Sequence, residues 1–324
     1  MAWADGPLTA CELVARHVYW RSPALQARNG RRREQARPAA VTVSRPRLRD
    51  HLAQLGVEGY PLVMVHSSVR NLAIAPGDPS APISNPIAVA SQLLADLISV
   101  VGACHTLVMP SHPHFPDDPG FLHDKSALVL EYSEAKTPSR VGLLTELFRR
   151  RPGVRRSRHP LSSLAALGPL AEELLRDNLN QSRPLPHGVH SSYFRFCKLG
   201  GLVISVGVPL IKAMTVLHVA EEVRDGEWPV RDFFYDRHFR VEHDSETQEW
   251  TVRERRPEFV RSLALGQARR DLLREGILTE TSLEGLRVDI ARAADVLDFM
   301  THKNRNSTYP YFLPSLSRVG GSLR

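Results

Sequence analysis

The sequence of 324 residues is poor in cysteine and in long apolar runs. Its three cysteines, Cys11, Cys104 and Cys197, are far apart and form no C-x-x-C motif, which argues against a disulfide framework and a cysteine-based zinc site. No window approaches the roughly eighteen uninterrupted apolar residues of a membrane span. The first residues also lack an apolar stretch followed by a small-residue cleavage site. We therefore expect an intracellular, cytoplasmic protein that is not bound to a membrane.

Acidic residues are fewer than basic ones, and the formal net charge is +7. This excess of positive charge favours an anionic partner. Nucleic acid, a phosphorylated small molecule and an acidic protein surface are the alternatives. Arginine is concentrated in residues 1–44, which include RRR at 31–33. The run has no interleaved aromatic residue and no recognised motif, so we interpret residues 1–44 as a solvated basic extension. A nucleic-acid-binding or partner-binding arm is the alternative.

From residue 45 onward, apolar runs of strand length alternate with segments of helical periodicity. This pattern predicts an α/β layered fold. Helices are predicted in RPRLRDHLAQLG and in NPIAVASQLLADLISVVG, where Asn85 is placed to cap the helix ahead of Pro86. A further helix is predicted after a start signal at Thr137 and Ser139. Buried strands are predicted in YPLVMVHSS, HTLVMPSH and GGLVISVGV.

Two segments depart from this alternation. Residues 111–137 are predicted to form a long polar loop, and loops of that length are usually functional. Residues 225–262 alternate apolar and polar residues with period two, as in PVRDFFYDRHFRVEHDSETQEWTVRERR. This predicts a small inserted antiparallel sheet within a single domain that covers residues 45–324.

The stretch MTVLHVAEE places His218 and Glu221 three positions apart, directly behind an apolar strand and a short connection. Residues at i and i+3 share one face of a helix, so both side chains can point into one cleft at the end of the strand. Zinc binding is disfavoured because the sequence has no H-E-x-x-H motif. On this helix alone, a structural pair and a catalytic pair are equally compatible with the pattern.

The long loop carries His112, His114 and Asp117, which could line a substrate mouth or coordinate a metal. Because the cluster has no fixed ligand spacing, we predict substrate binding and no metal. The stretch PGVRRSRHP includes Arg156 and Ser157, which suit phosphate oxygens. A solvated basic turn is the alternative for this stretch.

Four segments taken in order resemble one known family. They are VHSSVRNL at 65–72, TPSRVGLLTELFRRRPGVRRSRHPLSSLAALGPLAEEL at 137–174, GGLVISVG at 200–207 and TVLHVAEE at 215–222. The sequence resembles the aminoglycoside 3-N-acetyltransferase family over roughly residues 45–300. The resemblance implies an α/β/α layered sandwich and a coenzyme-A-dependent acyltransferase, with acetyl-coenzyme A or another acyl-coenzyme A as co-substrate.

The resemblance also implies roles for individual residues. It makes His218 the catalytic histidine and Glu221 the carboxylate that orients the site or the acceptor. Glu254, which follows Trp250 in the predicted insert, is the nearest match to a further glutamate of the family. The donor is expected to bind to residues of two motifs, which are Ser67, Ser68, Val69, Arg156, Ser157 and Ser163.

The sequence departs from the family in the segment that faces the acceptor. TVRERRPEF carries Arg253, Arg255 and Arg256 where the family has acidic residues, and these charges would repel a polycationic aminoglycoside. We therefore expect a small-molecule amine of secondary metabolism as the acceptor. An acyl carrier protein as donor is a variant, a homodimer stays open, and a silent relative that binds a ligand or nucleic acid is the alternative.

Overall fold

The computed structural model describes residues 41–70, 72–75, 82–115, 128–176, 178–224, 233–256 and 265–305, together with several single residues. Most of the predicted N-terminal extension lies outside the described residues, as does Asp117 of the long loop. Within the described part of the chain, no helix is long and apolar enough to cross a membrane.

The centre of the fold is a seven-stranded mixed sheet. β2 pairs in parallel with β8 and β4, and the remaining pairs of this sheet are antiparallel. In spatial order the strands are β11 (Leu278–Leu283), β12 (Leu286–Arg292), β8 (Leu202–Val206), β2 (Leu62–Ser67), β4 (Thr106–Pro110), β7 (Leu164–Leu167) and β6 (Arg155–Arg156).

The three central strands are buried along almost their whole length because helices cover both faces of the sheet. Met64 packs into one apolar core and its neighbour Val65 into the other, as the alternation of side chains in a strand requires. The predicted strands around residues 60–68, 105–112 and 200–208 are confirmed. Since β2, β4 and β8 run in parallel, their carboxyl ends meet at one edge of the sheet.

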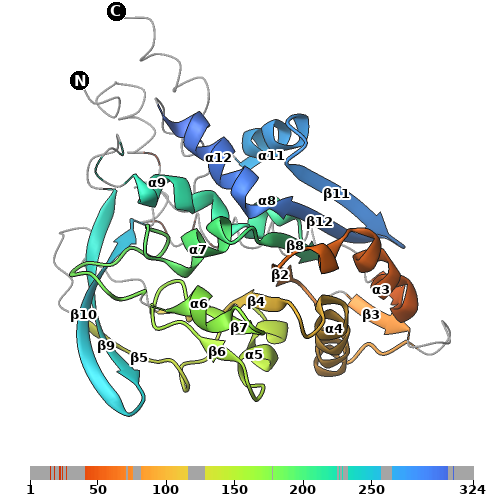
Figure 1. The fold of residues 1–324 in the computed structure, drawn as a ribbon, viewed down its shortest axis with the longest axis horizontal. Coiled ribbons are helices and arrows are strands. Elements are labelled where there is room, and N and C mark those ends of the chain that lie inside the picture. Colours follow the sequence, from red (N-terminus) through yellow and green to blue (C-terminus); the bar gives the residue numbers. More distant parts are fainter. Residues whose placement is uncertain are drawn as a thin grey trace, which may run out of the picture.

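Helices form a layer on each face, so the predicted α/β/α fold is confirmed (Figure 1). The first core is built with α3 (Arg45–Gln54), α4 (Pro86–Val101) and α5 (Leu143–Arg149). The second is built with α6 (Ala171–Leu175), α7 (Ser192–Lys198), α8 (Leu210–Ala213), η4 (Thr215–His218), α9 (Val219–Val223), α11 (Leu265–Arg274) and α12 (Ala293–Asn304).

A separate three-stranded sheet has the order β10 (Glu246–Arg255), β9 (Phe234–His243) and β5 (Val129–Ser133). β9 and β10 form the antiparallel hairpin that the period-two pattern predicted. The prediction that residues 111–137 form only a loop was wrong for β5, which pairs in parallel with β9. A distant partner of this kind stabilises a strand that is too short and too polar to be recognised by itself.

Helix boundaries and turns follow local chemistry. The side chain of Asn85 accepts hydrogen bonds from the N–H groups of Ile87 and Ala88 at 3.0 and 3.2 Å, which confirms the predicted cap of α4. The helix predicted to begin near Thr137 instead begins after Gly142, whose φ of 145° is accessible to glycine. Strands β11 and β12, which a tight turn joins, were not predicted from the sequence.

Candidate active site

His218 and Glu221 lie where the chain reaches the helical layer after β8. His218 is the last residue of η4, and Glu221 lies in the following helix α9. His218 Nδ1 is 3.1 Å from Glu221 Oε1. The histidine side chain is 13% exposed and the carboxylate is fully buried. The sequence spacing therefore does bring the two groups together, with only the imidazole open to an incoming molecule.

The hydrogen bond between this pair fixes the form of the imidazole. The carboxylate oxygen of Glu221 accepts the proton of His218 Nδ1, so Nε2 keeps the lone pair. Burial lowers the pKa of His218, and the positive charge of Arg255 lowers it further, whereas Glu221 opposes both effects. The imidazole is thus neutral near pH 7 and able to accept a proton.

Arg255, at the end of β10, compensates the negative charge beside His218. Its Nη1 donates to Glu221 Oε1 at 2.6 Å, and its Nε lies 3.4 Å from Glu222 Oε1. Its side chain is buried, so it is not a charge that lines open solvent. The arginine predicted to repel an acceptor therefore contacts two buried carboxylates instead.

Glu254 precedes Arg255 on β10, and neighbouring side chains of a strand point to opposite faces. Its carboxylate accepts hydrogen bonds from Tyr235 Oη at 2.8 Å and from Arg237 Nη1 at 2.7 Å. The structure thus gives Glu254 contacts within the small sheet, while its neighbour Arg255 contacts Glu221. The catalytic role of Glu254 stays a prediction.

A second histidine–carboxylate pair lies beside the first. His187, which precedes α7, lies 2.8 Å through Nδ1 from Glu222 Oε1, and its backbone N–H donates to Glu222 Oε2 at 2.6 Å. The rings of His187 and His218 have centroids 5.8 Å apart. Both side chains of the second pair are essentially inaccessible to solvent. Burial holds the pKa of His187 well below its usual value and raises that of Glu222.

His112 extends this cluster toward the sheet. Its Nε2 lies 2.7 Å from Tyr193 Oη of α7, and the Tyr193 ring packs edge-on against His187 with centroids 4.9 Å apart. Burial and the charges around it lower the pKa of His112 to about 3. His66 of β2 is also buried, which lowers its pKa to about 4. His114, a further candidate in this loop, is exposed.

The residues expected to hold the donor divide into two places. Ser67, Ser68 and Val69 lie where β2 ends, and Ser68 is exposed while Val69 is buried. The backbone N–H of Ser68 donates to the carbonyl of Val206 at 3.0 Å, which ties this turn to the end of β8. The turn therefore presents a serine at the edge of the sheet where the parallel strands end.

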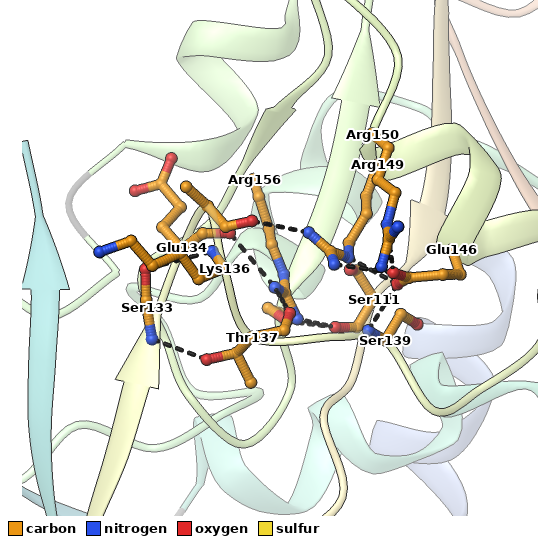
Figure 2. A network of polar contacts seen from close by, with 12 residues as sticks. Ser111, Ser133, Glu134, Lys136, Thr137, Ser139, Glu146, Arg149, Arg150 and Arg156 are labelled. Carbon is orange, nitrogen blue, oxygen red and sulfur yellow. Dashed lines mark hydrogen bonds and ion pairs between the residues drawn. The ribbon is translucent and has the colours of Figure 1, made fainter.

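Arg156 lies in β6 and is buried among oxygen atoms of the protein itself (Figure 2). Its Nη1 donates to the carbonyls of Thr137 at 2.5 Å and Glu134 at 3.2 Å. Its Nη2 donates to the carbonyl of Ser111 at 2.5 Å, and its Nε donates to Ser163 Oγ at 3.2 Å. The guanidinium thus joins the end of β4 to the segment between β5 and α5.

The two serines of the same motif also have internal partners. Ser157 Oγ accepts from the N–H of Leu164 at 3.0 Å, and Ser163 Oγ donates to the carbonyl of Ser111 at 2.6 Å. Both serines are buried. In Figure 2 a second cluster lies beside Arg156, where Arg149 and Arg150 converge on Glu146. These contacts suit a framework behind the donor site, and direct donor binding by the three motif residues stays a prediction.

The described residues contain no group of three or more histidine, cysteine, aspartate or glutamate side chains arranged to hold a metal ion. The imidazoles of the site are instead engaged one by one with carboxylates or a tyrosine. The arrangement is suited to proton transfer, because a neutral imidazole beside a carboxylate accepts a proton and the carboxylate stabilises the resulting charge.

Sequence reasoning missed His187, Glu222 and Tyr193, and it misjudged the contacts of Arg255. Glu222 stands four residues after His218, and helical residues at i and i+4 share a face, so the spacing did offer a signal for it. His66 had a signal, because it belongs to the strand motif VHSS and alternation places it on the face that carries the helix of His218.

The fold and the paired imidazole and carboxylate describe an α/β protein with a largely buried histidine–carboxylate pair whose chemistry suits proton transfer. A family model described as aminoglycoside 3-N-acetyltransferase matches residues 64–304, and the chain belongs to this family. It is similar to aminoglycoside N(3)-acetyltransferase III from Salmonella sp, with 33% identity over 184 residues that make up 54% of this chain and 58% of the relative. Aminoglycoside N(3)-acetyltransferase IX from Micromonospora chalcea is 33% identical over 196 residues, 56% of this chain and 63% of the relative. The chain thus spans about three-fifths of the length of these relatives.

Solved structures agree with this assignment. The apoenzyme of the aminoglycoside acetyltransferase AAC(3)-IVa matches with a TM-score of 0.63 and 25% identity, over 88% of this chain and 96% of that one. AAC(3)-Xa matches with a TM-score of 0.64 and 26% identity, over 81% and 92%. AAC(3)-IVa has also been solved as a variant with bound gentamicin. A relative solved with coenzyme A, AAC-IIIb, is 23% identical with a TM-score of 0.63, over 81% and 96%, and supports the fold alone.

Proposed function

We propose that this protein is a coenzyme-A-dependent N-acyltransferase that moves an acetyl group from acetyl-coenzyme A to an amine of a small molecule. The observation that carries the proposal is the pair His218–Glu221, in which a partly exposed neutral imidazole is oriented by a buried carboxylate. Membership of the acetyltransferase family supports the choice of reaction.

In this reaction acetyl-coenzyme A supplies an activated carbonyl carbon, and His218 handles the proton. Nε2 of His218 removes a proton from the amine as the nitrogen attacks, and it returns a proton to the departing sulfur. Glu221 holds Nδ1 throughout and stabilises the transient imidazolium. The depressed pKa of His218 serves this role, because the imidazole must enter the reaction unprotonated.

The donor site is proposed at the edge where β2 and β8 end. Ser67 and Ser68 are only partly buried or exposed, so their hydroxyl groups can contact the donor directly. Arg156 and Ser163 support this edge from behind, since both bind the carbonyl of Ser111 just after β4.

The acceptor is proposed to be a small amine that is not a polycationic aminoglycoside. The two carboxylates beside His218 already contact Arg255, so their attraction for additional ammonium groups is weakened. Arg253 adds a further positive charge on the same strand, with its guanidinium 4.6 Å from the centre of the Phe234 ring. A biosynthetic intermediate with one amine, or one that also carries an anionic group, fits this balance of charge.

Kinetics with gentamicin-like and kanamycin-like substrates tests the acceptor. We expect kcat/KM for these substrates to lie well below about 10⁴ M⁻¹s⁻¹, which is the lower end of the usual range for enzymes. Values at or above that range would contradict the proposed acceptor but leave the proposed reaction intact.

The donor has a second candidate, an acyl carrier protein, which the net charge of +7 favours because such carriers are acidic. Thermal stabilisation by acetyl-coenzyme A supports the proposed donor, since a ligand that binds only the folded state raises the melting temperature. Stabilisation by an acylated carrier protein alone would replace coenzyme A as the donor. A salt-sensitive shift with nucleic acid and no effect of either donor would contradict the enzyme assignment.

A further inference from the structure

The two histidine–carboxylate pairs share one arginine. Glu221 Oε1 is 3.1 Å from His218 Nδ1 and accepts from Arg255 Nη1 at 2.6 Å, so a single oxygen atom contacts both groups. A charge change at Arg255 is therefore transmitted to His218 through one shared atom as well as through space.

The opposite side of Arg255 is held by the second pair. Its Nε lies 3.4 Å from Glu222 Oε1, the same oxygen that lies 2.8 Å from His187 Nδ1. The other oxygen of Glu222 accepts from the backbone N–H of His187 at 2.6 Å. Glu222 is thus fixed by two contacts from one residue. All of these contacts are buried, so water competes with them little.

We propose that Arg255 is a positioning residue for the His218–Glu221 pair and that the His187–Glu222 pair holds Arg255 in that place. The inference rests on the proposed function only in its consequence for turnover, since the contacts exist in the protein alone. It assigns a role to three residues, Arg255, His187 and Glu222, that do not themselves take the proton from the amine.

The charges of this chain of contacts act on His218 in opposite directions. Arg255 disfavours a second proton on the imidazole, whereas Glu221 and Glu222 both favour it. Two carboxylates therefore act on His218, and one guanidinium contacts both of them. Without the guanidinium, the uncompensated negative charge would protonate the imidazole at higher pH and withdraw the base from the reaction.

Other described elements near His218 contribute a neutral tyrosine, a buried histidine and apolar side chains. Tyr193 of α7 packs against His187, and burial raises the pKa of its hydroxyl group, so it stays neutral. His159 interacts electrostatically with His187 and Glu222, and burial lowers its pKa to about 4. α12 packs on η4 and α9 and contributes apolar side chains to the shared core, including Val296.

The test is a pH titration of His218 by nitrogen-15 NMR in the full-length protein without substrates, with its resonance assigned by a His218→Gln variant. Arg255→Gln should raise the pKa of His218 by about one unit or more, because a positive charge is lost from a buried site. Glu222→Gln should lower the pKa of His218, because a negative charge is lost. Arg255→Lys, which keeps the charge, should restore most of the original value.

Arg240→Gln is the matched control. It removes the same charge from β9, where Arg240 contacts the exposed Glu131 and Glu249, and it should leave His218 unchanged. His187→Phe removes the side-chain contact to Glu222 and should raise the pKa of His218 by less than Arg255→Gln does. His187→Asn, which keeps a side-chain N–H, should reduce that effect.

Equal pKa values of His218 in Arg255→Gln and Arg240→Gln would overturn the inference. A shift in the same direction in Glu222→Gln and Arg255→Gln would also overturn it. If Arg255→Gln does not fold, Glu222→Gln and Arg255→Lys decide the question. Where turnover is found, the fall of the rate at low pH should move along the pH axis with the pKa of His218 measured by NMR. If the variants change the pKa of His218 as expected but the protein transfers no acyl group, the proposed function is refuted and the inference stands.

Discussion

Two buried arginines of this protein have opposite surroundings. Arg255 contacts the carboxylates of Glu221 and Glu222, whereas the contacts of Arg156 are to three backbone carbonyls and a serine hydroxyl. Burial lowers the pKa of the Arg156 guanidinium, but an arginine keeps its charge at any physiological pH. The same residue type therefore balances charge in one region and joins segments of backbone in the other.

The difference in contacts indicates an electrostatic role for Arg255 and a structural role for Arg156. A guanidinium between two carboxylates sets the electrostatic potential at the neighbouring imidazole, so its loss should be felt mainly in protonation and turnover. A guanidinium that donates to carbonyls satisfies backbone groups that would otherwise be buried without partners, so its loss should be felt mainly in stability. We therefore expect loss of Arg255 to change mainly protonation and turnover, and loss of Arg156 to change mainly stability.

The largest expected effect is on turnover in the Arg255 region. His218→Ala should lower kcat by about 10²–10⁴-fold, because it removes the group that accepts the proton. Donor binding, measured by calorimetry, should stay close to that of the wild type. Release of coenzyme A thiol in the presence of an amine acceptor gives the rate, and a kcat near that of the wild type would exclude His218 as the base.

The next effect is on stability in the Arg156 region. Arg156→Ala should lower the free energy of unfolding by about 2–4 kcal/mol, because four buried or partly buried hydrogen bonds to oxygen atoms of the protein are lost. Arg156→Lys should not restore it, since one ammonium group cannot reproduce the planar fork of donors. Acetyl-coenzyme A should also bind more weakly as the donor edge loosens.

Arg155→Ala is the control for this comparison. Arg155 adjoins Arg156 in β6, but its pair with Glu172 is exposed on both sides, so its loss should change stability by less than about 1 kcal/mol. Urea denaturation of the three variants measures the differences. Equal losses for Arg155→Ala and Arg156→Ala would contradict the framework role.

A smaller and broader effect concerns pH. His66, His112 and His159 have pKa values lowered to about 4, 3 and 4 by burial, so the unfolded chain binds their protons first as the pH falls below about 6.5. The stability that they contribute is present above pH 6.5 and is lost as the pH falls toward 4. Each of these histidines should lower the free energy of unfolding by roughly 1.4 kcal/mol per pH unit within that window.

Chemical denaturation between pH 7 and pH 4.5 measures this loss. A His112→Gln variant should show a shallower decline than the wild type if it folds, because one titrating group is removed. A stability that stays constant over the same range would mean that these imidazoles are protonated equally in the folded and unfolded states.

Much of the fold followed from local pattern. The buried strands β2, β4 and β8 were predicted because apolar runs of strand length leave few alternatives, and the cap at Asn85 was predicted from its place before Pro86. β5 and β12 were not predicted, because each depends on a partner strand that is distant in sequence or on a turn without a strong signal. Pairing of this kind is a property of the whole fold.

The candidate site was predicted in part for the same reason. His218 and Glu221 lie three residues apart, so helical geometry alone brings them together. Arg255 and His187 reach the same place from a strand and a loop that no spacing rule connects to the helix. Glu254 and Arg255 are adjacent in a strand, so the strand register decides which of them faces the site. A shift of the register by one residue would exchange their positions.

The decisive measurement for the proposed acetyl transfer is mass spectrometry of a panel of small amines incubated with acetyl-coenzyme A and the purified protein, with His218→Ala in parallel. We predict that at least one amine gains a single acetyl group in step with release of free coenzyme A, and that His218→Ala forms this product at a rate lower by about 10²-fold or more. Equal product formation by the two proteins would contradict the account. So would a panel in which acetyl-coenzyme A binds the protein and no amine is ever acetylated.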